Sequence, residues 1–494
     1  MKKARGSKQA GRFIVSNGRE IYGELTLAGD NTSLYLQDND EFSTRDVPGR
    51  RITGVLRDLT KVSLIDCVTM SGTGSVTRGA EGYQFATVFP HFVVSGETYL
   101  DPEQTNIDQV RFIVDDASTL FYDFDAFSLA LDAKPFIEGI VNANANVVSR
   151  EIDTGPDPKI LYFTGKREIF AVDTKLGRVR ASHNPSHNLG GPNGVWLKNT
   201  IVLAITFSAP VIFSEAISRM STLLRYLELL VGRPQNIVSL SLATNSSHQR
   251  PAFLEVYWSL PPNRSRSRGE KPQPRDVLLD AIGHTESFSI VLKNWLDRDQ
   301  DWRAARARFF TGFGKQNHYT IDRLIGAANM FDILPISAVP LDNPLSDDIV
   351  LARKISRDAF AVLPKTPERD SVLSALGRIS KPALKRKIRH RARLITATVG
   401  RNFPDLDLVT DEAVICRNFY VHGSDASFDY NANLDCVNFF TDALEFVFAA
   451  SDLVQAGWDV VSWCSTPTSM SHPFARFLIN YREHLRELKG VLPP

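Results

Sequence analysis

Three polar residues lie close together near the end of an otherwise apolar segment, residues 410–423 (TDEAVICRNFYVHG). At about 100° per residue of a helix, Asn418 and His422 lie one turn apart on one face, with Arg417 beside them. The three side chains can therefore converge. An imidazole can transfer a proton near neutral pH, and a guanidinium can bind phosphate oxygens through a planar fork of donors. The segment is thus a candidate site for proton transfer at a phosphate.

Residues on either side of this group predict where its helix begins and ends. Thr410 is the expected N-cap, and Asp411 and Glu412 are expected in the first turn, where carboxylates suit the helix dipole. Gly423 is expected to end the helix, which places His422 in the last turn. The alternative interpretation is a solvated helix end without a catalytic role, because such short polar patterns recur easily.

The loose pattern, an Arg and a His separated by four to six residues, occurs three times in the chain. Arg178 with His183 and Arg180 with His187 also match, but they fall in a Gly/Pro/Asn-rich stretch that is expected to be a loop. An apolar residue follows each of these arginines, so neither has a polar companion. His183 and His187 have a spacing that metal ligands can use, yet no Cys or acid lies nearby in the sequence. We therefore expect no metal site there. Of the three arginines, Arg417 is the candidate, because a polar residue follows it and it lies on a predicted helix.

Composition describes an ordinary globular protein. The chain has 494 residues, of which 43% are hydrophobic and 23% charged, and a formal net charge of +1. This length predicts two or three domains, and the balanced charge requires any nucleic-acid affinity to come from local patches. No CxxC pair is present, so we expect a reduced cytoplasmic protein with buried thiols rather than a disulfide scaffold or a zinc site. The cysteines are Cys67, Cys416, Cys436 and Cys464.

Neither a membrane segment nor a cofactor motif is expected. The basic N-terminus is not followed by an apolar signal core, and the longest apolar run, residues 201–213, is too short to span a bilayer. We interpret this run as a buried strand. The sequence contains no P-loop and no dinucleotide-binding fingerprint, so no cofactor is predicted.

The first part of the chain, residues 1–300, is predicted to be β-rich. Short runs of Val, Ile, Tyr and Thr are separated by Gly, Pro, Asn and Asp, which is typical of a curved sheet or a sandwich. The pair Asn17-Gly18 predicts a hairpin turn. One helix is expected at about residues 214–231, with Ser214 as its N-cap.

An all-α domain is predicted for residues 301–494. After a Pro- and Arg-rich linker at residues 261–276, apolar residues recur with a helical period from about residue 287 onward. Pro, Gly or Asn separates most of these helical patterns, which indicates a helical bundle. The overall prediction is an α+β multidomain chain, with a β-rich domain followed by a helical one.

A strongly basic helix is predicted within residues 381–395 (KPALKRKIRHRARLI). Apolar residues recur on one side of it, so the basic residues are expected to coat the exposed side as an RNA-phosphate surface. A solvated face balanced by acids elsewhere is the equal alternative. The candidates are Lys385, Arg386, Lys387, Arg389, Arg391 and Arg393. Three linker arginines can add phosphate contacts, although disorder is expected there: Arg264, Arg266 and Arg268.

Arg417, the polar residue after it and His422, near a helix end in a helical bundle, resemble the ribonuclease motif of the HEPN superfamily. The layout of the chain, a β-rich part opening GRFIVSNGREIYGELTL and then the bundle, resembles the ApeA family of bacterial anti-phage defence proteins. This resemblance implies a metal-independent endoribonuclease that acts by abortive infection. It implies proton transfer by His422, phosphate binding by Arg417, and a role for Asn418 in orienting His422 or binding a phosphate oxygen.

The implied partners are RNA, with tRNA among the candidates, a second copy of the chain and a phage-encoded trigger. The 2′-hydroxyl of RNA would attack the adjacent phosphate, leaving 2′,3′-cyclic phosphate and 5′-OH ends. HEPN nucleases dimerise so that two motifs face each other, which supplies both an acid and a base. Two alternatives stay open: a non-catalytic HEPN adaptor for RNA binding or dimerisation, and the toxin of a toxin–antitoxin pair.

Overall fold

A computed structural model describes residues 8–15, 18–40, 42, 51–69, 74–78, 81–144, 147, 153–188, 190–244, 252–262, 270–340, 345–466 and 469–493. Asn17 and the three linker arginines lie outside these residues. The chain divides into two compact units, Met1–Arg266 with Pro272–Asp297 and Ser267–Lys271 with Arg298–Pro494.

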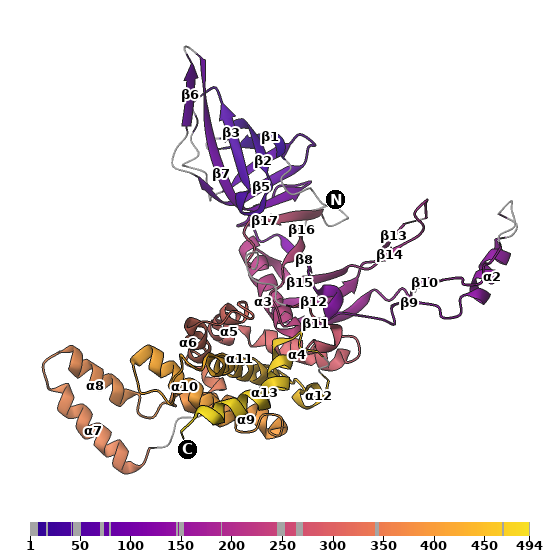
Figure 1. The fold of residues 1–494 in the computed structure, drawn as a ribbon. Helices are drawn as coiled ribbons and strands as arrows, with labels where there is room; N and C mark the ends of the chain where they lie inside the picture. The colour runs from indigo at the N-terminus through magenta and orange to yellow at the C-terminus, as the bar shows by residue number, and fades with distance from the viewer. Residues whose placement is uncertain are drawn as a thin grey trace. The chain divides into compact units, whose positions relative to one another are not determined.

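One antiparallel sheet organises the first unit, and part of it closes on itself (Figure 1). Strands β7, β3, β2, β1, β4 and β5 pair in this order, and β5 pairs again with β7. Alternate residues such as Phe13, Leu34 and Leu64 point inward and are buried, as the period of two in a strand requires. The bounds are β1 (Lys8–Ile14), β2 (Glu20–Thr26), β3 (Ser33–Asp38), β4 (Ile52–Leu56), β5 (Lys61–Thr69), β6 (Gly74–Arg78) and β7 (Glu81–Gly96).

The same sheet continues beyond β7 in the order β17, β16, β8, β15, β12 and β11. Helix α3 (Phe213–Val231) packs on β8 and β15, and α4 (Thr285–Asp297) packs on β11. The predicted helix is confirmed, but Ser214 lies inside it and Ile212 takes the N-cap position without a side-chain hydrogen bond. The strands are β8 (Ile107–Val114), β11 (Glu168–Thr174), β12 (Gly177–His183), β15 (Ile201–Val211), β16 (Ile237–Thr244) and β17 (Ala252–Trp258).

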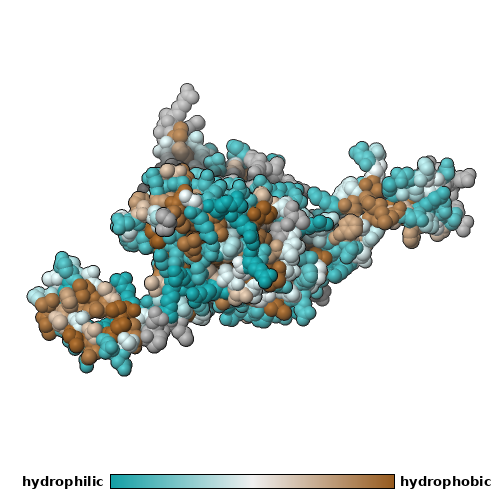
Figure 2. Space-filling model, turned by 60° about the horizontal axis from the view of Figure 1, so that its bottom comes forward, coloured by the Kyte–Doolittle hydropathy of each residue, from teal (hydrophilic) through white to brown (hydrophobic). Residues whose placement is uncertain are grey.

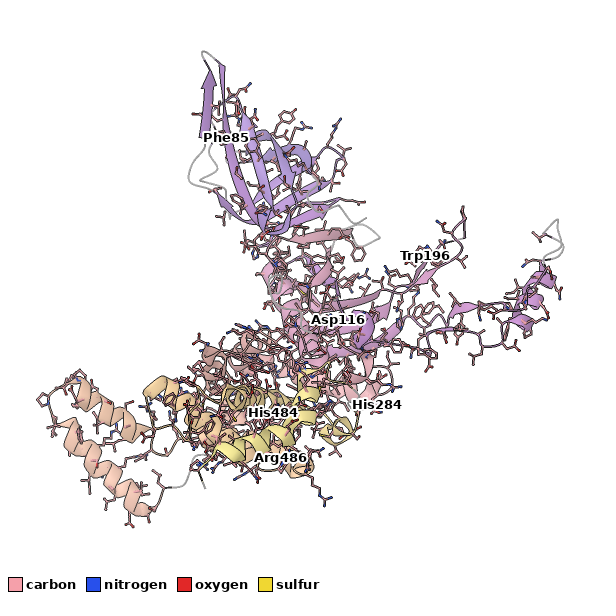
Figure 3. All side chains as sticks on the ribbon, in the orientation of Figure 1. Phe85, Asp116, Trp196, His284, His484 and Arg486 are labelled. Carbon is pink, nitrogen blue, oxygen red and sulfur yellow. The ribbon has the colours of Figure 1, made fainter. Side chains whose placement is uncertain are left out.

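Smaller elements complete the first unit. Two short hairpins extend from it, and Trp196 lies on one of them (Figure 3). The elements are α1 (Ala117–Leu120), α2 (Lys134–Ala143), β9 (Phe127–Leu129) paired with β10 (Leu161–Phe163), and β13 (Ser186–His187) paired with β14 (Leu197–Lys198).

The predicted loop around Arg178 and His183 is instead strand β12, which pairs with both β11 and β15. His183 is buried, with Nε2 3.3 Å from Asp123 Oδ2 and Nδ1 2.9 Å from Asn199 Nδ2. The loop prediction was wrong because Gly177 is the first residue of the strand, and the other Gly, Pro and Asn residues come only after the strand has ended. His183 is therefore a hydrogen-bonded core residue rather than a free ligand.

The second unit is helical, so the predicted order of a β-rich part followed by a helical part is confirmed. Helix α11 lies at its centre and contacts α5, α6, α9, α10 and α13. Most of its residues are buried, as expected for a helix surrounded by others. The helices are α5 (Asp299–Phe313), α6 (Ile321–Asn329), α7 (Asp347–Ala361), α8 (Pro367–Gly377), α9 (Leu384–Val399), α10 (Leu406–His422), α11 (Leu434–Ala456), α12 (Val460–Cys464) and α13 (Pro473–Val491).

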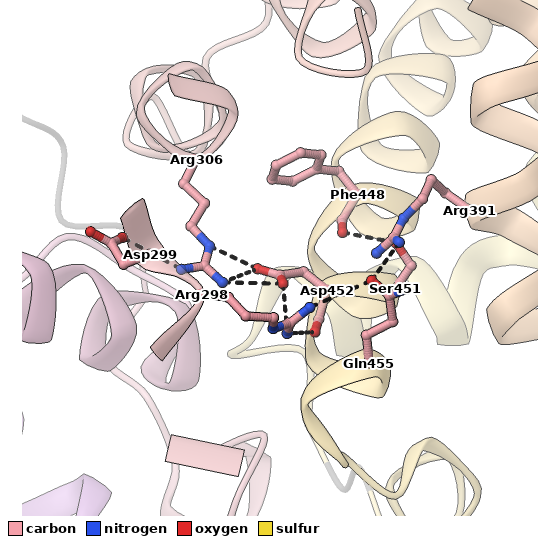
Figure 4. Close-up of polar contacts among 8 residues, drawn as sticks. All are labelled: Arg298, Asp299, Arg306, Arg391, Phe448, Ser451, Asp452 and Gln455. Atoms are coloured by element: carbon pink, nitrogen blue, oxygen red, sulfur yellow. Dashed lines mark hydrogen bonds and ion pairs between the residues drawn. The ribbon is translucent and has the colours of Figure 1, made fainter. Parts of the chain in front are cut away.

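Buried arginines fasten α5 and α9 to α11 (Figure 4). Arg306 donates from Nε and Nη2 to the two carboxyl oxygens of Asp452, at 2.9 and 3.1 Å. Arg391 donates to Ser451 Oγ at 2.8 Å and to Gln455 Oε1 at 2.6 Å. Arg391 is fully buried. The expectation that it coats an exposed RNA-binding face is therefore wrong, because polar side chains of α11 receive it inside the bundle.

A second buried polar group makes the stability of this unit depend on pH. The hydroxyl of Tyr319 lies 2.8 Å from both carboxyl oxygens of Asp442. Burial first, and then the charge of Glu445, raises the pKa of Asp442 from 3.8 to about 6. The folded pKa lies above the unfolded one, so the stabilising contribution is full below about pH 4 and is lost as the pH rises through 6.

Between about pH 7.5 and pH 5 we expect the wild-type protein to gain more unfolding free energy than the Asp442→Asn variant does, by a difference on the order of 1 kcal/mol. Urea unfolding at the two pH values measures this difference. The matched control is Asp425→Asn, which changes an exposed carboxylate of the same unit. An equal gain in wild type and in Asp442→Asn would contradict the assignment of the titration to Asp442.

No helix in the described part of the chain is both long enough and apolar enough to cross a membrane. Three of the four thiols are buried, as predicted, and Cys464 is partly exposed. Burial raises the pKa of Cys67 and of Cys416 to about 12, which keeps both as unreactive thiols.

Candidate functional site

Helix α10 carries the three polar residues, and it begins earlier than its sequence predicts. The first helical residue is Leu406, and Thr410 is buried inside the helix, where its Oγ1 donates to the carbonyl of Asp407 at 3.1 Å. The capping prediction for Thr410 was wrong because buried Leu406 and Val409 extend the apolar face by another turn. The predicted end is confirmed: Gly423 has a φ of +65°, which favours glycine.

The three side chains converge at the C-terminal end of α10. Arg417 Nη1 donates to Asn418 Oδ1 at 3.0 Å and also lies 3.0 Å from His422 Nε2. Because a guanidinium has only donors, Nε2 is the acceptor in this contact. Asn418 therefore contacts Arg417 rather than His422, which differs from one of its two expected roles.

A fourth residue, Asn329, completes the group and was missed by the sequence reasoning. It is the last residue of α6, and its Oδ1 accepts from Arg417 Nη2 at 2.9 Å. The two residues are 88 positions apart in sequence. No spacing rule connects them, and only the packing of α6 against α10 brings the amide to the guanidinium. Asn329 thus holds Nη2, the nitrogen of Arg417 that does not contact His422.

Exposure differs along the group. Arg417 and Asn418 are partly buried, while His422 is exposed at the helix end. Arg417 Nε is buried and has no hydrogen-bond partner among the described residues. Its Nη1 and Nη2 are each engaged by neighbouring side chains. Neighbouring side chains thus hold the guanidinium through Nη1 and Nη2, and the imidazole of His422 beside it is open to a ligand.

Aromatic side chains hold the segment that follows the helix. Tyr430 is buried against Phe419 at 5.4 Å between ring centroids and against Phe428 at 4.7 Å. Its hydroxyl accepts from the backbone N–H of Ser427 at 3.3 Å. Tyr420 donates to Asn431 Oδ1 at 3.4 Å. These contacts fold the segment back onto the last two turns of α10, so the end of the helix that carries His422 is supported.

The basic helix is α9, and it packs on α10. Lys385, Arg389 and Arg393 follow one another at intervals of four residues, so they share a face. Arg389 pairs with Asp411 of α10, which links this face to the helix of the site. Lys387 donates to Asp332 Oδ1 at 3.3 Å, on a different side of α9.

The predicted basic candidates therefore do not form one surface. Arg386 points about 100° round the helix from Lys385, and Arg391 lies in the interior as described above. The face that begins at Lys385 and ends at Arg393 stays a candidate phosphate-binding surface. Among the described residues, no three His, Cys, Asp or Glu side chains gather in an arrangement that could hold a metal ion.

Comparison with protein families places both parts of the chain. Residues 10–295 match the family model described as ApeA N-terminal domain 1, which spans more than half of the chain. Residues 325–461 match the model described as Apea-like HEPN, and this range includes Asn329, Arg417, Asn418 and His422. No curated protein and no solved structure gave a match. The two matches point to an anti-phage HEPN nuclease. The chain therefore belongs to the ApeA family, with the N-terminal domain of that family and a C-terminal HEPN domain.

Proposed function

We propose that the chain is a metal-independent endoribonuclease that acts in anti-phage defence by abortive infection. The observation that carries this proposal is the position of Arg417 Nη1, which lies 3.0 Å from both His422 Nε2 and Asn418 Oδ1 at the exposed end of α10. A proton-transfer group and a phosphate-binding group are thereby held side by side at a surface that RNA can reach.

The proposed reaction is attack by a 2′-hydroxyl of RNA on the adjacent phosphorus. The bond from 2′-oxygen to phosphorus forms and the bond from phosphorus to 5′-oxygen breaks. One imidazole removes the 2′-proton, and another delivers a proton to the 5′-oxygen, so that the products are a 2′,3′-cyclic phosphate and a 5′-OH. The guanidinium of Arg417 stabilises the charge that develops on the phosphate oxygens.

His422 suits the role of base in this arrangement. Its Nε2 carries a lone pair, which accepts from Arg417 in the absence of RNA. A phosphate oxygen that binds the guanidinium replaces Nε2 as its acceptor and releases the lone pair beside the 2′-hydroxyl. Oδ1 of Asn418 accepts from Arg417, and its Nδ2 is the donor that can contact a phosphate oxygen.

Two copies of the chain are needed for the complete reaction. One motif contributes one imidazole, whereas the reaction requires a base and an acid at the same time. A two-fold axis through the site would place His422 of each copy on opposite sides of one phosphate. We therefore propose a homodimer as the active form, with RNA as the substrate, tRNA among the candidates, and an N-terminal domain that senses a phage-encoded trigger or restrains the nuclease.

Cleavage of a defined RNA in the presence of EDTA tests this reaction. We expect cleavage to persist, to leave cyclic phosphate ends, and to stop when the nucleotide before the cut carries 2′-hydrogen instead of 2′-hydroxyl. Cleavage of that 2′-deoxy substrate, or products with 5′-phosphate ends, would show that water rather than the 2′-hydroxyl is the nucleophile.

Removal of the Asn329 amide is expected to slow cleavage moderately. In Asn329→Ala the guanidinium of Arg417 loses one of its fixed acceptors, at 2.9 Å, so we expect kcat to fall by about tenfold, equivalent to about 1.4 kcal/mol. Single-turnover cleavage measures this rate. The matched control is Asn317→Ala, because Asn317 also accepts from an arginine, Arg476 at 3.2 Å, outside the site. Equal rates for the two variants would deny Asn329 a positioning role.

The basic face of α9 is expected to bind RNA phosphates. Replacing Lys385 and Arg393 by alanine removes two cations, which should lower the slope of log affinity against log salt by about 1.4 for single-stranded RNA. Affinity measured across a salt series gives this slope. Arg486 and Lys489, which are exposed on α13, provide the matched pair of control substitutions. An unaltered slope in the Lys385/Arg393 variant would exclude this face from the interface.

Phage challenge separates the proposal from its alternatives. A nuclease that acts by abortive infection requires His422 for protection, whereas an adaptor that only binds RNA or dimerises does not. A toxin that is neutralised by a partner protein would arrest growth without phage when it is expressed alone. Protection retained by a His422→Ala strain therefore favours the adaptor, and arrest without phage favours the toxin.

A further inference from the structure

The hairpin formed by α7 and α8 packs chiefly on itself. It lies beside the other helices of the second unit without extensive contact with any of them (Figure 1). No described residue of either helix is buried. Helices of 15 and 11 residues have little stability of their own in water, since a helix in a protein depends on packing of an apolar face.

Helix α7 has an apolar stripe that does not face α8. The side chains that are partly covered by the hairpin, among them Phe360 and Ser356, lie on one side of the helix. At 100° per residue, a second side is formed by residues spaced by four, four and three positions. We name it the α7 stripe: Leu351, Ile355 and Ala359 of the helix, with Val362 at its C-cap.

The α7 stripe is open to solvent. Leu351, Ile355 and Val362 are 58%, 60% and 84% exposed. Figure 2 shows hydrophobic surface on this hairpin, at the lower left of the view. Spacings of three and four residues are those of a helix–helix seam, and contiguous apolar surface of this kind marks an interaction site.

Charges beside the stripe are arranged to match a second copy of the same helix. Lys354 and Asp358 lie on one flank of the α7 stripe, one turn apart and both exposed. When two copies of α7 pair antiparallel about a two-fold axis, the same flank of each helix meets its equivalent. Centred near residue 356, this pairing sets Lys354 of each copy opposite Asp358 of the other. Such reciprocity is what a two-fold contact requires.

We propose that the α7 stripe binds the α7 stripe of a second copy, antiparallel, with Lys354 and Asp358 pairing reciprocally. The stripe covers about 17 Å by 10 Å, roughly a fifth of the 800 Å² per partner in a standard interface. An area of this size therefore reinforces another contact between the same two chains. That other contact is the meeting of two motifs in the proposed function, and the inference rests on the proposed function at this point. The hairpin is inserted between α6, which carries Asn329, and α9, which packs on α10.

Charge reversal with mixing tests the proposal in the full-length protein. Lys354→Asp leaves an acid at both 354 and 358, and Asp358→Lys leaves a base at both. Each variant alone should dimerise at least tenfold more weakly than wild type in sedimentation equilibrium, and an equimolar mixture should recover the wild-type dimer constant. The attraction between residues 354 and 358 within one helix is lost in both variants and cannot return on mixing, so recovery reports contact between copies.

A second variant tests the apolar part. Leu351→Lys with Ile355→Lys should also weaken the dimer at least tenfold, while circular dichroism shows helix content unchanged; Ile333→Lys, at an exposed apolar residue outside the hairpin, is the control. A wild-type dimer constant in the stripe variant, or a mixture no tighter than its components, overturns the proposal. So does a wild-type chain that stays monomeric at all concentrations, which would assign the stripe to a different protein. None of these readouts depends on RNA cleavage. A monomeric wild type would also contradict the homodimer of the proposed function, whereas a wild-type dimer constant in the stripe variant overturns the α7 contact alone.

Discussion

Replacing His422 by alanine is expected to lower the rate of RNA cleavage by about a hundredfold or more, which is the usual contribution of a positioned general acid or base. In a two-fold dimer the substitution removes both imidazoles from one phosphate, so neither the 2′-proton nor the 5′-oxygen retains its partner. Fold and RNA binding should persist, because the ring is exposed and Arg417 keeps Asn418 and Asn329 as acceptors. Single-turnover cleavage at saturating RNA measures the change.

His484→Ala is the matched control for this experiment. That histidine is partly exposed on α13 of the same unit, where its Nδ1 lies 3.2 Å from Glu487 Oε2 (Figure 3). The His484→Ala variant should cleave RNA at the wild-type rate. If His422→Ala also cleaves at the wild-type rate, the catalytic base lies elsewhere and the convergence at the end of α10 is a solvated helix end.

Local signals predicted the end of α10 but not its start. Gly423 needs no tertiary contact to end a helix, because its positive φ follows from the residue itself. The start depends on burial, because Leu406 and Val409 lie in the core. Their packing extends the helix through Thr410, the residue that was predicted to be its N-cap. The motif was therefore placed correctly on a helix whose first turn was assigned too late.

Charge patterning misassigned Arg391 for a related reason. A helical period separates apolar from polar residues, and the prediction made from it places every arginine on the exposed face. Ser451 and Gln455 of α11, about sixty residues away, supply polar partners inside the bundle, and no rule of spacing reveals them. Asn329 was missed by the same limitation, since its contact with Arg417 exists only through packing of α6 on α10.

In the first unit, strand content was predictable while topology was not. Short runs of Val, Ile, Tyr and Thr between turn residues identified most of the strands, since this signal is local. Closure of the sheet depends on β7, which pairs with β3, β5, β6 and β17. Such pairings join segments far apart in the chain, so the prediction could reach a curved sheet or a sandwich but not this order.

Arg417→Lys is expected to lower cleavage by about 10²–10³-fold, although it preserves the positive charge. The fork of Arg417 contacts Asn418, His422 and Asn329 at 3.0, 3.0 and 2.9 Å, from two different nitrogens. A single ammonium cannot reproduce this planar arrangement, so the phosphate would be bound by charge but not aligned with the imidazole. The effect should therefore appear in kcat, with RNA affinity changed much less.

The matched control for this variant is Arg482→Lys. Arg482 is exposed on α13 and donates from Nη2 to the carbonyl of Arg401 at 2.7 Å, so it tests the loss of one forked donor outside the site. Urea unfolding of both variants separates stability from catalysis. A loss of affinity with unchanged kcat in Arg417→Lys would contradict transition-state alignment and would leave Arg417 as a binding residue. Near wild-type values of both would show that a positive charge at this place is sufficient, because then the geometry of the fork contributes nothing to the reaction.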